Sequence, residues 1–135
     1  MARPIAVGRM PGQRDGGFTL IELLVVMAIV ATLAMIAVPR YFSSLEQARE
    51  TTLRQDLSIM REAIDKYFGD LGAYPETLAD LVDKRYLRAL PSDPLTKSTE
   101  TWITVPNDNP ELPGIKDVHS GAQGEDRNGR PFAEL

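Results

Sequence analysis

The sequence predicts an α+β protein with one long N-terminal helix, whose first half spans a membrane, packed on a small antiparallel sheet. Three observations support this: an almost uncharged apolar run at residues 18–38, an amphipathic stripe that continues to about residue 68, and two β-prone segments after residue 100. The 135 residues allow one small domain. We divide the chain into a basic segment at 1–17, a membrane-spanning helix at 18–39 and a head at 40–135.

The composition excludes several functional classes. A formal net charge of −4 argues against nucleic acid as a partner, because a phosphate-binding surface needs a basic excess. The absence of cysteine excludes disulfides, thiolate nucleophiles and cysteine-based metal centres. The single histidine, His119, leaves little room for a histidine-rich metal site.

The first 38 residues have the pattern of a basic segment followed by a membrane span. The first 17 residues contain three arginines, Arg3, Arg9 and Arg14, and one acidic residue, Asp15. The 21 residues from 18 to 38 carry one charge. Twenty-one helical residues cover roughly 30 Å, the thickness of the hydrocarbon core. The arginines place the N-terminus in the cytoplasm and the rest of the chain across the membrane. A plain anchor and a secretory signal peptide are the two simplest interpretations, although the run is long for a signal peptide.

Glu22 is the one charge inside this run, and neither simple interpretation explains it. A charged side chain inside the membrane costs roughly 2.5–3.5 kcal/mol on insertion scales, and it needs a partner. A free amine at Phe18 would supply a cation one helical turn away. That amine exists only if the chain is cut between Gly17 and Phe18.

The run Gly-Phe-Thr-Leu-Ile-Glu at residues 17–22 resembles the prepilin motif of type IV pilins and type II secretion pseudopilins. In that family a membrane peptidase cuts after the glycine on the cytoplasmic side. The resemblance therefore implies a pilin-like fold, a leader that is cleaved between Gly17 and Phe18, and N-methylation of Phe18. It also implies that Glu22 acts in subunit assembly.

The helix is expected to continue past Pro39, which loosens or kinks a helix without necessarily ending it. Glu50 with Arg54 and Glu62 with Lys66 are predicted ion pairs at i,i+4 spacing. Gly69 and Gly72 predict the end of the helix near residue 68. An apolar stripe at three- and four-residue steps should pack against the head; it consists of Phe42, Leu45, Ala48, Leu53, Leu57, Met60, Ile64, Tyr67 and Phe68.

The head begins with a turn and a short helix near residues 77–82, where Thr77 and Asp80 approximate a capping box. The Tyr-Pro pair at 74–75 and the Leu-Pro-Ser-Asp-Pro segment at 90–94 resemble the major pseudopilin of type II secretion. Two strands are predicted at residues 102–105 and 115–119, with Phe132 as a candidate for a third.

Residues 117–129 are rich in glycine and oxygen donors, a composition that suits a hard cation. Major pseudopilins carry a calcium loop here, in which a Gly-Ala-Asp-Gly run supplies one ligand. This chain has Gln123 at the place of that acid, so the remaining candidate calcium ligands are Asp117, Glu125 and Asp126. No cofactor is otherwise required, and a solvated turn without a metal is the alternative interpretation.

No enzymatic activity is expected. Asp117, His119 and Ser120 are the residue types of a hydrolase triad, but on a strand Ser120 points to the opposite face from the other two. We therefore predict a structural protein.

The function predicted from these patterns is a structural subunit of a pilus-like fibre, with the major pseudopilin of a type II protein secretion system preferred. The expected partners are further copies of the chain in a helical fibre, the prepilin peptidase, an inner-membrane assembly platform, minor pseudopilins and membrane lipid. The expected location is the bacterial inner membrane, with one span, a cytoplasmic N-terminus and a periplasmic head. A type IV pilin subunit and a membrane-anchored binding protein that never polymerises are the alternatives.

Overall fold

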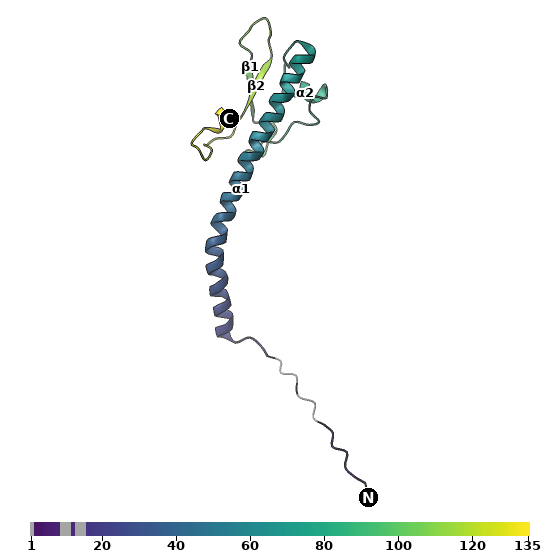
Figure 1. Ribbon diagram of the computed structural model, residues 1–135, viewed down its shortest axis with the longest axis vertical. Coiled ribbons are helices and arrows are strands. Elements are labelled where there is room, and N and C mark those ends of the chain that lie inside the picture. Colours follow the sequence, from purple (N-terminus) through teal and green to yellow (C-terminus); the bar gives the residue numbers. More distant parts are fainter. Residues whose placement is uncertain (1, 9–11, 13–15) are drawn as a thin grey trace. The chain divides into compact units, whose positions relative to one another are not determined.

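The computed structural model describes residues 2–8, 12 and 16–135. Arg9, Arg14 and Asp15, on which the predicted charge of the leader partly depends, lie outside these described residues. The element order is α1 (Leu20–Leu71), α2 (Leu78–Asp83), β1 (Trp102–Pro106), β2 (Ile115–Ser120) and the 3₁₀ helix η1 (Phe132–Glu134), as Figure 1 shows. One long N-terminal helix and a small antiparallel sheet confirm the predicted α+β class.

The helix α1 is continuous over 52 residues and contains Pro39 in its interior. It ends at Leu71, because Gly72 takes a left-handed conformation with φ of 67° and donates its N–H to the carbonyl of Phe68 over 2.8 Å. Gly72 is thus the stop that was predicted, whereas Gly69 lies inside the helix and does not interrupt it. The helix therefore runs three residues beyond the predicted end at Phe68.

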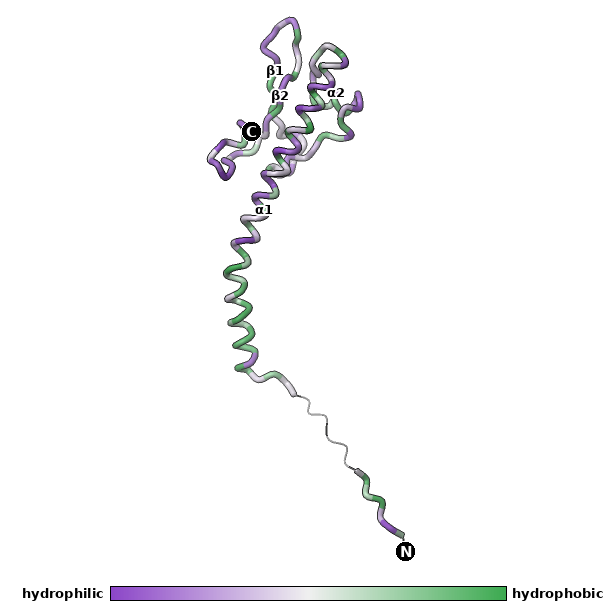
Figure 2. Tube along the Cα trace, in the orientation of Figure 1, coloured by the Kyte–Doolittle hydropathy of each residue, from purple (hydrophilic) through white to green (hydrophobic). Residues whose placement is uncertain are grey.

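The chain divides into two compact units, one that ends at Arg40 and one from Tyr41 to Leu135. In the first unit, an 18-residue window of α1 has a mean hydropathy of 2.7 and none of it is buried. By length and composition this helix could cross a membrane. Figure 2 shows the corresponding stretch of α1 in green, the colour of hydrophobic residues.

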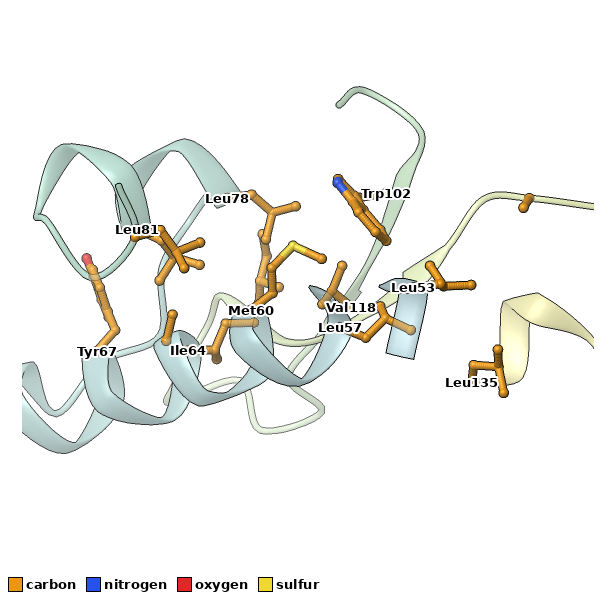
Figure 3. Close-up of a cluster of buried hydrophobic side chains, with 14 of the residues drawn as sticks. Leu53, Leu57, Met60, Ile64, Tyr67, Leu78, Leu81, Trp102, Val118 and Leu135 are labelled. Carbon is orange, nitrogen blue, oxygen red and sulfur yellow. The ribbon is translucent and has the colours of Figure 1, made fainter. Parts of the chain in front are cut away.

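The core of the second unit lies between α1, α2 and the sheet, as Figure 3 shows. The predicted stripe is buried only from Leu53 onward, whereas Phe42 is 57% exposed and Ala48 is also exposed. The apolar residues of the stripe are buried only along the part of α1 against which the core of the head packs. The buried members of the stripe on α1 are Leu53, Leu57, Met60, Ile64 and Tyr67. Together with Ala63, which was not part of the predicted stripe, they pack with Leu78, Leu81, Trp102, Ile115 and Val118.

The helix α2 begins with the predicted capping contact. The carboxylate of Asp80 accepts the backbone N–H of Thr77 over 2.9 Å, so an aspartate performs here what glutamate or glutamine more often does. Leu78 and Leu81 are buried in the core and Val82 is half-buried against it, as the inward face of this helix was predicted to be.

The sheet contains two antiparallel strands, with Trp102 opposite Ser120 and Thr104 opposite Val118. The register shifts between Val105 and Pro106, where the proline cannot donate to the ladder. A third strand at Phe132 is not formed. That residue begins η1, and an isolated bridge between Glu125 and Pro131 closes the preceding loop instead.

Candidate assembly site at the start of the first helix

The cleavage candidates Gly17 and Phe18 precede the first residue of α1, in non-helical backbone. Phe18 is 91% exposed. A Cβ atom added at residue 17 would meet no described atom within 4 Å. The fold of this chain therefore places no steric demand for glycine at position 17.

Glu22 lies in the first turn of α1, where it forms a reciprocal cap with Thr19. Its Oε2 accepts the Thr19 N–H over 2.8 Å, and the Thr19 hydroxyl oxygen accepts the Glu22 N–H over 3.3 Å. This arrangement is a capping box, and a carboxylate in the first turn also interacts favourably with the helix dipole. The Thr-x-x-Glu spacing at residues 19–22 signals this box in the sequence, but our sequence interpretation assigned Glu22 only to a charge partner.

The surroundings of Glu22 are apolar and open. A shallow hollow around it is lined by Phe18, Ile21, Val25 and Val26 in addition to Glu22 itself. Ile21 is 69% exposed and Val25 is 51% exposed. The start of α1 thus combines one carboxylate with a large apolar surface that the described chain leaves uncovered, which in water would be unfavourable.

The three candidate metal ligands of the C-terminal segment are not brought together. The carboxylate of Asp117 accepts the Arg61 Nε–H and the Val118 N–H, both over 2.7 Å. Asp126 instead faces Arg54, while Glu125 is exposed. Within the described part of the chain there is no group of three or more histidine, cysteine, aspartate or glutamate side chains that could hold a metal ion.

Asp126 organises the tip of this segment. Its Oδ1 accepts the N–H groups of Asn128 over 2.8 Å and of Arg130 over 2.9 Å, and its Oδ2 accepts Arg54 Nη2 over 2.5 Å. The hydrogen bonds from the Arg130 and Asn128 backbone and the charge of Arg54 hold the pKa of Asp126 below its ordinary value, although desolvation acts in the opposite direction. Three N–H donors surround this carboxylate, whereas a calcium ion needs six to eight oxygen ligands.

In the rejected triad His119 lies beside Asp117, whereas Ser120 has a different partner. The Ser120 hydroxyl is buried and donates to Asp93 over 2.5 Å. His119 Nδ1 lies 3.0 Å from the backbone oxygen of Leu135, and its Nε2 lies 3.7 Å from Asp117.

Asp93 belongs to the Leu-Pro-Ser-Asp-Pro segment on which part of the resemblance rests, but sequence reasoning gave it no structural role. It is fully buried, and its carboxylate also accepts the backbone N–H groups of Leu95 and Thr96. The adjacent Pro91 carbonyl accepts the Trp102 indole N–H over 2.8 Å. The Leu-Pro-Ser-Asp-Pro segment therefore ties the loop before β1 to both strands.

Comparison with known proteins identifies the family. Residues 12–38 match the model of the prokaryotic N-terminal methylation motif. The type II secretion system core protein G of Pseudomonas aeruginosa is 37% identical over 101 residues, which is 63% of this chain and 71% of that protein. The chain belongs to the type II secretion system core protein G family.

Two other members of the family are similarly related. The core protein G of Pectobacterium carotovorum is 34% identical over 62% of this chain and 64% of that protein, and the one of Klebsiella pneumoniae is 35% identical over 61% and 70%. No solved structure matches the chain. The core protein G family is a structural pseudopilin family and not an enzyme family, and the predicted resemblance to pseudopilins is confirmed. The apolar α1 agrees with anchoring in the inner membrane.

Proposed function

We propose that this chain is cleaved between Gly17 and Phe18, methylated on the new N-terminus, and then assembled as the repeating subunit of a type II secretion pseudopilus. The family membership and the methylation motif support the general role. In the fibre, the apolar surface of α1 is buried against α1 of neighbouring copies, and the heads face outward.

The observation that carries this proposal is the state of Glu22. Hydrogen bonds within the described chain reach only its Oε2, and the apolar residues around it are exposed. Cleavage creates an ammonium group at Phe18, which is the cation that a carboxylate in an apolar environment requires. A neighbouring subunit that offers this amine to Glu22 satisfies both charges while it covers the apolar surface.

The topology follows from charge. Arg3, Arg9 and Arg14 precede the apolar run and no basic residue lies inside it, which supports a cytoplasmic N-terminus and a periplasmic head before assembly. The partners that this role implies are the prepilin peptidase, the inner-membrane assembly platform, minor pseudopilins and membrane lipid. The role requires no catalysis by the chain itself.

Intact-mass analysis of membrane-extracted protein tests the proposal, together with electron microscopy of fibres from cells that express the secretion machinery. The expected product begins at Phe18 and carries one methyl group. Gly17→Leu should retain the leader and form no fibres. Gly16→Leu is the matched control, and it should be cleaved. A chain that keeps residues 1–17, or is cut at another bond, would remove the proposal, and a cleaved chain that never polymerises would favour a membrane-anchored binding protein.

A further inference from the structure

The loop from Gly121 to Pro131 is organised around one buried carboxylate. The side chain of Asp126 is 1% exposed, and the backbone on either side closes around it. The Asp126 N–H donates to the Arg130 carbonyl over 2.8 Å, and the Gly129 N–H donates to the Asp126 carbonyl over 3.0 Å. The Asp126 carboxylate also accepts the backbone N–H groups of Asn128 and Arg130, so the loop is closed around this one side chain.

The charge that pairs Asp126 comes from α1. Arg54 Nη2 reaches Asp126 across 72 positions of sequence, although Glu50 lies one helical turn before Arg54. The Arg54 side chain remains 45% exposed, so its guanidinium joins solvent on one side to the buried carboxylate on the other. Arginine suits this place because its planar fork is less strongly hydrated than an ammonium group.

Two further arginines hold the same C-terminal segment to α1. Arg61 donates to the Asp117 carboxylate, to the Val118 carbonyl over 2.9 Å and to the Leu135 backbone oxygen over 2.5 Å. Arg127, at the tip of the loop, donates to the Ser43 carbonyl over 3.0 Å. Guanidinium groups of the chain itself thus hold both the strand end of the segment and its C-terminus, through Arg61, and the tip of the loop, through Arg127, to α1.

We propose that the guanidinium of Arg54 takes the place of a metal cation in this loop, so that the head of this protein folds and holds its C-terminal segment without calcium. A calcium ion would have to displace the Arg54 guanidinium and two backbone N–H groups from the Asp126 carboxylate. Gln123, at the place where the resemblance implies an acidic ligand, is exposed and adds no charge. The inference concerns the head alone and does not depend on whether the chain polymerises.

The experiment uses the full chain in a non-ionic detergent. Trp102 is the only tryptophan and is buried in the head, so its emission on heating reports the unfolding of the head. We expect the melting temperature to be the same, within about 1 °C, in millimolar calcium chloride and in excess chelator. Arg54→Ala should lower it by at least about 6 °C, the smallest shift expected when a domain of this size loses one hydrogen bond to a charged group.

Limited trypsin digestion provides a local measurement. Arg127 is an exposed cleavage site within the loop, because its peptide bond to Asn128 is one that trypsin cuts, whereas the bond from Arg130 to Pro131 is resistant. Arg54→Ala should be cut there at least about tenfold faster, because an opening free energy that falls by 1.4 kcal/mol makes the open loop tenfold more populated. Arg54→Lys keeps the positive charge and should retain part of the protection. Lys66→Gln is the matched control, since it removes an α1 cation whose pair with Glu62 is 64% exposed, and it should behave like the unmodified chain.

Three results would overturn the inference. A rise of more than about 4 °C in the melting temperature of the unmodified chain with calcium would show that the head uses the metal. Cleavage of Arg54→Ala at the rate of Lys66→Gln would show that Arg54 does not hold the loop. Equal cleavage of Arg54→Lys and Arg54→Ala would show that the positive charge is not what the loop requires.

Discussion

Replacing Glu22 in two different ways separates its two possible roles. Glu22→Gln keeps an oxygen that can accept the Thr19 N–H, a contact that measures 2.8 Å in the structure, but removes the charge. Glu22→Val removes both the charge and the capping oxygen. If Glu22 acts as the charge partner of a neighbouring Phe18 amine, both variants should fail to assemble to a similar degree.

The magnitudes of the two roles differ enough to be distinguished. Loss of a capping contact costs about 1 kcal/mol and affects only the first turn of α1. Removal of one partner from a buried ion pair costs about 3–5 kcal/mol, because the remaining charge stays desolvated and unpaired. At 1.4 kcal/mol for each factor of ten, the second loss weakens each subunit contact by more than about a hundredfold. A fibre depends on many such contacts in series, so both variants should yield almost no fibres.

The assay compares fibre yield from cells that express the complete secretion machinery, by immunoblotting of sheared fibres and by electron microscopy. Intact mass first establishes that each variant is cleaved after Gly17 and remains in the membrane fraction. Glu46→Gln is the matched control, because it removes one carboxylate from an exposed position of the same helix outside the apolar run. It should assemble normally.

Two results would refute the reasoning. If Glu22→Gln forms fibres at the yield of the unmodified chain while Glu22→Val does not, the carboxylate acts through the helix cap and the ion pair between subunits is absent. Normal yield from both variants would remove Glu22 from assembly altogether and favour the membrane-anchored alternative.

Three further predictions concern the head, and each is measured by urea unfolding of the full chain in detergent with Trp102 emission as the signal. Leu57→Ala should lower the free energy of unfolding by about 2–5 kcal/mol, because Leu57 is 1% exposed. Leu71→Ala, at a 47% exposed position, should change the free energy of unfolding by less than about 1 kcal/mol. Equal effects of the two substitutions would contradict the assigned core. Asp93→Ala should cost about 3 kcal/mol or more, since it leaves the Ser120 hydroxyl and two backbone N–H groups without their acceptor, and the exposed Asp108→Ala should cost less than about 1 kcal/mol. Burial and the nearby Asp93 carboxylate raise the pKa of Asp56, so the ionised form of Asp56 destabilises the folded head at neutral pH. Asp56→Asn should therefore be more stable than the unmodified chain at pH 7, and its advantage should shrink as the pH falls through the raised pKa. A stability advantage that does not change with pH would contradict this prediction.

The sequence alone determined the features that depend on local or one-dimensional patterns. The membrane-spanning length of residues 18–38 and the position of Glu22 within them are readable without a fold, because crossing a bilayer depends on the length and composition of one linear segment. Cleavage after Gly17 stays a prediction from the same linear pattern. The Thr77–Asp80 cap and the stop at Gly72 were equally predictable, since each depends on residues within one helical turn.

Two local predictions failed because tertiary contacts outweighed local preference. Phe132 has the aromatic character of a strand residue, yet it lies in η1 and joins the core, where burial of its ring contributes more than a further ladder contact would. The apolar stripe was predicted from Phe42, but it is buried only from Leu53 onward, and Leu45 before it is half-buried. The periodicity of a sequence shows which side of a helix is apolar. It does not show how far along the helix the rest of the protein packs against that side.

The ion pair of Arg54 shows most clearly a contact that the tertiary structure, and not the local sequence, determined. Glu50 and Arg54 have the favourable i,i+4 order, and the equivalent pair of Glu62 with Lys66 does form, over 2.9 Å. Arg54 instead pairs with Asp126, which the folded head places beside α1. An exposed pair on one helix is worth only a few tenths of a kcal/mol, whereas a buried carboxylate without a cation would cost several. The guanidinium therefore goes where a charge would otherwise remain unpaired, and only folding determines where that carboxylate lies.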